Sequence, residues 1–202
     1  MVTSPVSRGA LTLLPCLAVL AWASPALGHV EGGQAAGLLS GLSHPVSGFD
    51  HILAMVAVGL WGAQLGPPAV WLLPVAFPMA MAFGGMLALV GLPLPGVEVG
   101  IAASAVVLGA MVLSEARPRL SIALVLVGAF ALFHGHAHGT ELPGGQSGLA
   151  YSIGFVVATG CLHGVGIAIG LLHRWPRGRT ALRLAGGLIA ASGLLFLWRA
   201  LS

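Results

Sequence analysis

The sequence predicts an all-α polytopic membrane protein with six transmembrane helices after a cleaved signal peptide. Hydrophobic residues make up 57% of the chain and charged residues only 6%, whereas a soluble domain usually carries about a quarter charged residues. Several continuous apolar runs approach the ~20 residues that a helix needs to cross a bilayer. Because these runs do not alternate polar with apolar residues as barrel strands do, helices are the expected spanning form.

Residues 1–28 have the features of a secretory signal peptide. Arg8 supplies the positive charge at the start, an apolar stretch follows, and the small residue Gly28 ends the segment. Cleavage after Gly28 makes His29 the N-terminus of a mature chain, 29–202. The alternative is that the segment is retained as an uncleaved first helix.

The mature chain is expected to be one six-helix transmembrane domain. A short apolar stretch at 35–42 comes first. The spans that we expect after it are 48–65, 69–90, 97–114, 120–138, 148–172 and 184–201. Short glycine-rich, proline-rich or arginine-rich connections separate them. Pro74 and Pro78 lie inside the second span and should kink it.

The arginines predict how the chain is oriented. Arg117 and Arg119 lie between the third and fourth spans, and four more arginines lie in or beside the loop 173–183. The positive-inside rule places both loops in the cytoplasm. A signal peptide independently places residue 29 outside, so we expect a bacterial inner-membrane protein with a periplasmic N-terminus. The formal net charge of +3 therefore reflects membrane orientation, and we expect no nucleic-acid partner.

This topology gathers most of the histidines and acidic residues at the outer face of the membrane. Imidazole with carboxylate is a ligand set that suits nickel, cobalt, zinc or copper, whereas calcium and magnesium prefer oxygen ligands alone. The sequence therefore predicts an outward-facing site for a divalent transition metal. The candidate ligands on this face are His29, His44, Asp50, His51, His134, His136, His138 and Glu141.

The first group of candidate ligands lies at the start of the first span. Pro45 and Gly48 predict a turn before the helix, which would fold His44 back toward Asp50 and His51. The alternative is that His44 and Asp50 only cap the helix start.

The second group, His134, His136 and His138, lies near the end of the fourth span. Ideal helix geometry places His134 and His138 on one face and points His136 away. All three would converge only if the backbone unwound at Gly135 or Gly139. The alternative is a cluster that merely faces the lipid headgroups.

His163 lies well inside the fifth span, near Gly160, Gly164 and Gly166. Small residues at this spacing permit close approach of a neighbouring helix. An intramembrane histidine either belongs to a transport path or hydrogen-bonds a neighbouring helix, and both interpretations stay open for His163.

These stretches resemble the HupE/UreJ family of small bacterial membrane proteins, which is associated with nickel supply to hydrogenase and urease. The resemblance rests on His44-Pro45-x-x-Gly48-x-Asp50-His51, with support from residues 133–141 and 159–166. It covers essentially the mature chain. It implies a nickel or cobalt permease in which His44, Asp50 and His51 are the metal-binding motif.

We therefore expect an inner-membrane importer of Ni²⁺ or Co²⁺, and not an enzyme. The metal ion is its transported substrate, the lipid bilayer is its surroundings, and no cofactor is expected. The glycine-rich helices leave room for a homo-oligomer. The sequence contains no P-loop motif for ATP hydrolysis. The alternatives are a membrane-embedded metalloenzyme or haem protein that uses the same histidines, and an exporter or metal sensor.

Overall fold

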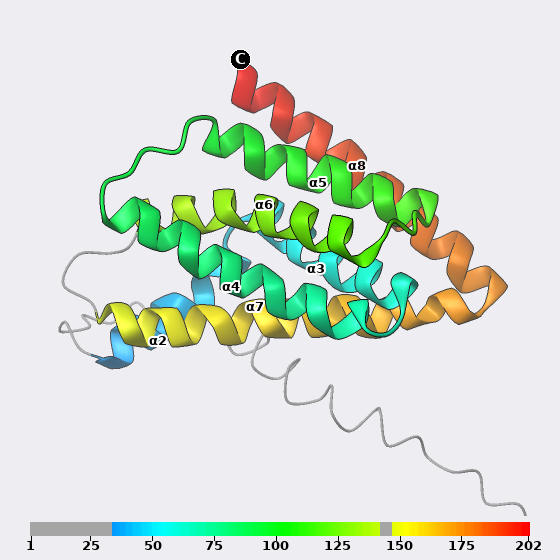
Figure 1. Cartoon of the computed structure of the whole chain (residues 1–202), viewed down its shortest axis with the longest axis horizontal. Coiled ribbons are helices and arrows are strands. Elements are labelled where there is room, and N and C mark those ends of the chain that lie inside the picture. Colours follow the sequence, from blue (N-terminus) through cyan, green and yellow to red (C-terminus); the bar gives the residue numbers. More distant parts are fainter. Residues whose placement is uncertain (1–33, 142–146) are drawn as a thin grey trace, which may run out of the picture.

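The protein is a bundle of helices (Figure 1). The computed structural model describes residues 34–141 and 147–202, and every regular element within these ranges is a helix. The elements are α2 (Gln34–Ser43), η1 (His44–Val46), α3 (Phe49–Leu65), α4 (Ala69–Leu89), α5 (Val97–Ser114), α6 (Leu120–Thr140), α7 (Gly148–Gly170), η2 (Leu171–Arg174) and α8 (Pro176–Leu201). The expected signal peptide and His29 lie outside the described residues.

Five helical segments are long and apolar enough to cross a membrane: α4, α5, α6, α7 with η2, and α8. A sixth span is possible only as a bent pair, in which residues 36–46 and 49–65 meet at 77°. The chain is thus a multi-pass all-α membrane protein, and its described part holds five spans, or six if the bent pair counts as one.

The predicted spans agree closely with the observed helices at most of their ends. The third span, 97–114, has the bounds of α5, and the first begins within one residue of α3. The apolar stretch at 35–42, which was not predicted as a span, forms α2 and packs against α7. The second span is a continuous helix through Pro74 and Pro78.

The last helix differs from the prediction, because α8 begins at Pro176 and not at residue 184. Proline at the first helical position suits a helix start, and arginine is a good helix former. The basic segment therefore continues the helix beyond its apolar part, and Arg177, Arg179 and Arg183 lie in its first turns.

Helix α3 lies at the centre of the bundle, where it packs against α4, α5, α7 and α8. Its residues 57–64 are all buried. Around it, α5 pairs with α8 and α4 pairs with α6, while α2 and α7 lie together at the opposite edge (Figure 1). Because α3 is central, Asp50 and His51 in its first turn lie inside the bundle at one of its two ends.

Glycines allow the closest helix contacts. A Cβ atom added to Gly59 on α3 would lie 2.8 Å from the Cα of Gly166 on α7. Gly135 on α6 packs so closely on α4 that a Cβ atom there would overlap the carbonyl of Met81. Small residues at such crossings are how membrane helices approach each other.

A network of polar contacts joins the helices at the other end of the bundle. The Trp61 Nε1–H donates to the carbonyl of Ala116 at 2.9 Å, and Arg179 forms an ion pair with Glu115. The hydrogen bond from Arg179 holds the pKa of the Glu115 carboxyl below its usual value. Glu98 and Glu115 are 17 residues apart along α5 and its C-cap, so the two ends are separated by about 25 Å at 1.5 Å per residue.

We predict that Gly59→Ala lowers the free energy of unfolding by about 1–3 kcal/mol, because its methyl group has no room between α3 and α7. Gly160→Ala is the matched control, because no atom of another described helix lies within 4 Å of the added Cβ position. That control should be neutral or should raise stability by up to about 1 kcal/mol, since alanine favours a helix more than glycine. Thermal unfolding in detergent micelles measures both, and equal effects would contradict the packing described for α3 and α7.

Candidate metal site

The turn between α2 and α3 folds His44 back toward the start of α3, as predicted. Pro45 occupies the beginning of η1, and Gly48 adopts an extended conformation just before α3. A Cβ atom on Gly48 would lie 2.8 Å from Asp50 Oδ1 and 2.9 Å from His51 Nδ1. Glycine at this position therefore leaves the space that these two side chains occupy.

A polar cavity of 240 Å³ lies beside this turn. Its walls come from η1 and its flanking turn, α3, α5 and the end of α6, so segments far apart in the sequence meet there. The structure thus brings together the predicted ligands near residue 50 and those near residue 138. The cavity is lined by His44, Ser47, Gly48, Asp50, His51, Glu98, Ile101, Ala137, His138 and Glu141.

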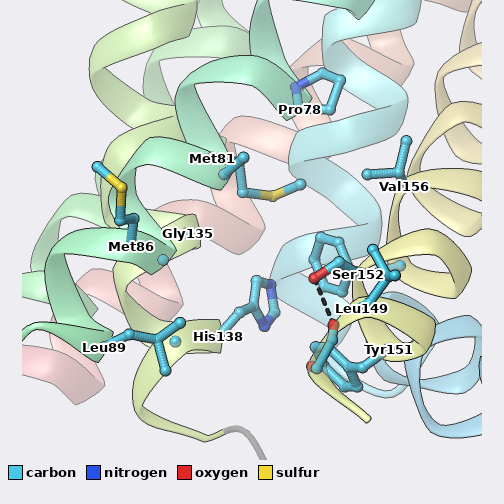
Figure 2. A pocket seen from close by; sticks show the side chains of 15 residues that line it. Pro78, Met81, Met86, Leu89, Gly135, His138, Leu149, Tyr151, Ser152 and Val156 are labelled. Atoms are coloured by element: carbon cyan, nitrogen blue, oxygen red, sulfur yellow. Dashed lines mark hydrogen bonds between the residues drawn. The ribbon is translucent and has the colours of Figure 1, made fainter. Parts of the chain in front are cut away.

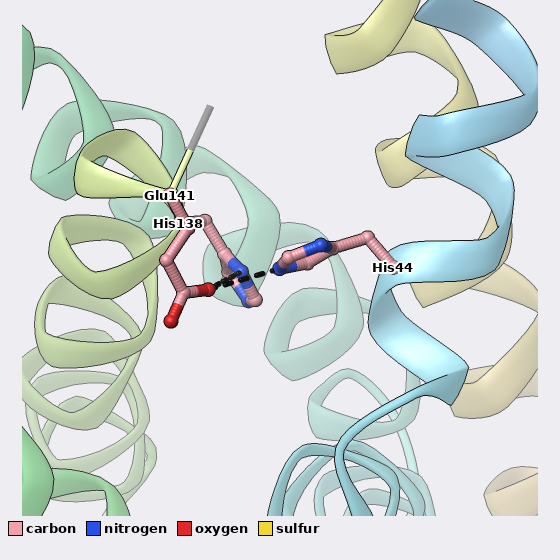
Figure 3. Close-up of side chains that lie close together, drawn as sticks. All are labelled: His44, His138 and Glu141. Atoms are coloured by element: carbon pink, nitrogen blue, oxygen red, sulfur yellow. Dashed lines mark hydrogen bonds and ion pairs between the residues drawn. The ribbon is translucent and has the colours of Figure 1, made fainter. Parts of the chain in front are cut away.

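Three of these side chains converge most closely (Figure 3). His44, His138 and Glu141 each offer one ligand atom, and these atoms lie within 4.8 Å of one another. The His44 Nε2 is 3.1 Å from Glu141 Oε2, and His138 Nδ1 is 4.0 Å from the same oxygen. Two imidazoles and a carboxylate form a ligand set typical of a transition-metal ion.

The Asp50 carboxylate orients His51. Its Oδ1 accepts hydrogen bonds from the His51 backbone N–H at 2.9 Å and from His51 Nδ1 at 2.8 Å. Because an ionised carboxylate only accepts, Nδ1 must carry the proton and Nε2 keeps its lone pair. A carboxylate behind an imidazole is the usual support of a metal-binding histidine. Asp50 is not the N-cap, which is Gly48.

A second histidine is held in the same way by a backbone group. His134 Nδ1 donates to the carbonyl of Phe130 at 3.0 Å, so its Nε2 also keeps a lone pair. The His134 ring centroid is 5.0 Å from that of His51, and the His51 and His138 centroids are 4.6 Å apart.

The nitrogens that remain are buried without hydrogen-bond partners. His51 Nε2, His134 Nε2 and both ring nitrogens of His138 make no hydrogen bond to any described residue. A buried polar group left in this state costs about 1–3 kcal/mol. A bound cation would remove this cost, because each of these atoms can donate a lone pair to it.

His136 points away from this cluster, as ideal helix geometry predicts. Its Nε2 donates to the carbonyl of Leu92 at 2.9 Å, in the connection between α4 and α5. Helix α6 continues through Gly135 and Gly139 to Thr140, so the unwinding that would bring all three histidines together is not observed. The predicted His29 ligand lies outside the described residues.

His163 lies deeper in the bundle, on α7, with only 1% of its surface exposed. The ring of Phe77 contacts both His163 and an outer histidine, His134. The Phe77 centroid is 5.5 Å from that of His134 and 5.4 Å from that of His163. One aromatic ring therefore connects His163 to the outer cluster.

A largely apolar groove of 290 Å³ lies on the other side of His138, between α4, α6 and α7. Figure 2 shows His138 pointing into it, with Met81 and Tyr151 nearby. Its rim residues Met86 and Leu149 are exposed, and exposed apolar side chains of a membrane helix face lipid. His138 therefore lines both the polar cavity and this apolar groove.

Glu98 and Phe77 were not among the candidate ligands predicted from the sequence. Glu98 lines the cavity from the first turn of α5. It is one of only five acidic residues in the chain and lies at the outer end of a predicted span. These two features could have identified it as a site residue from the sequence. Phe77 had no such signal, because an aromatic residue is ordinary within an apolar helix.

Comparison with known proteins shows extensive similarity. A family model described as HupE / UreJ protein matches residues 17–196. Protein HupE of Rhizobium leguminosarum bv. viciae is 47% identical over 181 residues, which covers 90% of this chain and 94% of that protein. No solved structure matches the chain.

We predict that Asp50→Asn weakens Ni²⁺ binding about 10-fold to 100-fold, the usual effect of losing the group that orients a metal-binding histidine. The substitution conserves the shape of the side chain but no longer dictates which His51 nitrogen carries the proton. Competition with a chromophoric chelator in detergent solution measures the affinity.

His136→Gln is the matched control, because glutamine can still donate to the Leu92 carbonyl outside the cavity. It should leave the affinity close to that of the wild type. A control variant that lost as much affinity as Asp50→Asn would show that the cavity is not the binding site.

Proposed function

We propose, from the premise that this chain belongs to the HupE / UreJ family, that it imports Ni²⁺ or Co²⁺ across the bacterial inner membrane. The family is associated with nickel and cobalt uptake for hydrogenase and urease, so the ion would supply metalloenzymes of this kind. The observation that carries the proposal is the convergence of His44, His138 and Glu141 on one point of a polar cavity.

The chemistry of the cavity favours a divalent transition metal. Its histidines offer neutral nitrogen donors, which nickel and cobalt accept readily and calcium and magnesium do not. Three carboxylates, from Asp50, Glu98 and Glu141, line the same cavity. Their charges would concentrate a dication at its mouth.

The order of the histidines supports transfer of the ion and not permanent storage. His44 is the most exposed of them, the rings of His138, His51 and His134 follow in successive contact, and Phe77 contacts both His134 and His163. Neighbouring rings along this line have centroids 4.6–5.5 Å apart. A path with several moderately strong sites in sequence allows an ion both to enter and to leave.

The membrane potential supplies enough free energy for uptake. At about 2.3 kcal/mol per charge per 100 mV, a dication gains about 4.6 kcal/mol on moving inward. The arginine-rich end of the bundle, with Arg179 on Glu115, lies opposite the cavity. The positive-inside rule then supports a periplasmic cavity and a cytoplasmic exit.

Reconstitution into liposomes tests this function. We predict that the wild-type protein carries Ni²⁺ or Co²⁺ inward under an inside-negative potential, and that Glu141→Gln lowers the initial rate about tenfold or more, as loss of a metal ligand or its support does. Intravesicular metal-sensitive dye fluorescence measures the rate.

Glu115→Gln is the control for this experiment, because it makes the same carboxylate-to-amide change at the opposite end of the bundle. Its rate should stay near that of the wild type, since an exposed ion pair contributes little to stability. Absence of metal flux in the wild type, or equal losses in both variants, would refute the proposal.

A further inference from the structure

Polar groups without partners also occur deep in the bundle, away from the cavity. His163 and Thr159 on α7 are 1% and 0% exposed. Both nitrogens of His163 and the Thr159 hydroxyl make no hydrogen bond within the described part of the chain. The two residues are four positions apart on one helix, so their side chains lie on the same face.

The unpartnered Thr159 hydroxyl is unusual for a helix. A threonine inside a helix commonly satisfies its hydroxyl by donating to the carbonyl one turn earlier. Other hydroxyls of this chain do so, such as Ser152, which donates to the Gly148 carbonyl at 2.8 Å. Thr159 therefore keeps a buried hydroxyl available beside His163.

A backbone carbonyl of α4 faces His163. Pro78 has no N–H, so the carbonyl of Pro74 lacks the donor that an ordinary helix would give it four residues later. This carbonyl interacts with His163, although neither ring nitrogen of His163 reaches a hydrogen bond of normal geometry in the described structure. Phe77, one turn from Pro74, contacts the rings of both His163 and His134.

We propose that His163, Thr159 and the Pro74 carbonyl form an inner station for the transported dication, and that Pro78 serves it by leaving that carbonyl without a helical partner. The proposal rests on the transport function proposed above. The ion would reach this station after it passes Phe77. His163 is seven residues from Gly170, where α7 ends, so the station lies about 10 Å from that end at 1.5 Å per residue.

The donors of the inner station differ from those of the outer cavity in charge. An imidazole, a hydroxyl and a carbonyl are all neutral, whereas the cavity is lined by carboxylates. A neutral station holds a dication less tightly than one with acidic ligands, because the Coulomb attraction is missing. Weak binding at the last station favours release toward the cytoplasm.

Two prolines one turn apart offer a matched pair of variants. Pro78→Ala restores an N–H that can bond the Pro74 carbonyl, and so withdraws this carbonyl from the ion. Pro74→Ala restores a different hydrogen bond, to the carbonyl of Val70, and leaves the carbonyl of residue 74 available. Thr159→Val removes the hydroxyl while conserving the shape of the side chain.

The experiment measures two properties of each variant: the rate of Co²⁺ entry into proteoliposomes, and the Co²⁺ affinity of the outer cavity in detergent. We expect Pro78→Ala and Thr159→Val to lower the entry rate about tenfold, in line with the loss of one group at a metal site. Their affinity for Co²⁺ should match that of the wild type. Their thermal unfolding midpoints should be no lower, because alanine favours a helix more than proline does and because Thr159→Val removes a buried hydroxyl that has no partner among the described residues. Pro74→Ala should lower the entry rate less than Pro78→Ala does.

Unchanged entry in both Pro78→Ala and Thr159→Val would overturn the inner station while leaving the transport function intact. Equal losses in Pro78→Ala and Pro74→Ala would also overturn it, because they would show an effect of helix shape alone. A wild-type protein that carries no Co²⁺ and no Ni²⁺ would instead overturn the transport function, and the station with it.

Discussion

The arrangement of this bundle depends on one constraint: several imidazole nitrogens are buried in an apolar interior without hydrogen-bond partners. Among the described residues these include nitrogens of His51, His134 and His138. A fold tolerates unpartnered groups when another function uses them. Here the other nitrogen of His51 is fixed by Asp50 and that of His134 by a backbone carbonyl, so each ring presents a lone pair in a defined direction.

Helix packing fixes the positions of these histidine rings inside the bundle. Helix α3 is enclosed by four others, and its contact with α7 has no room for a side chain at Gly59. Gly135 holds α6 against α4 in the same way, which positions His134 and His138 beside α3. The same glycines that make the bundle compact therefore also set the distances between the histidines.

The sequence was informative about spans, turns and helix faces, because hydropathy and helical periodicity are local properties. They predicted the bounds of α5, the turn at Pro45 and Gly48, and the opposite directions of His136 and His138. The start of α8 was missed because hydropathy reports where a membrane span begins, not where a helix begins. The Phe77 contacts and the bond from His136 to Leu92 depend on how separate helices pack, and no local pattern contains that information.

X-ray absorption spectroscopy of the protein loaded with one equivalent of Ni²⁺ tests the central claim most directly. The structure predicts a first shell of nitrogen and oxygen, with the outer-shell scattering of at least two imidazole rings, and loss of imidazole scattering in His138→Ala. A shell of oxygen alone, or an imidazole signal unchanged in His138→Ala, would contradict the assignment of the buried histidines as metal ligands.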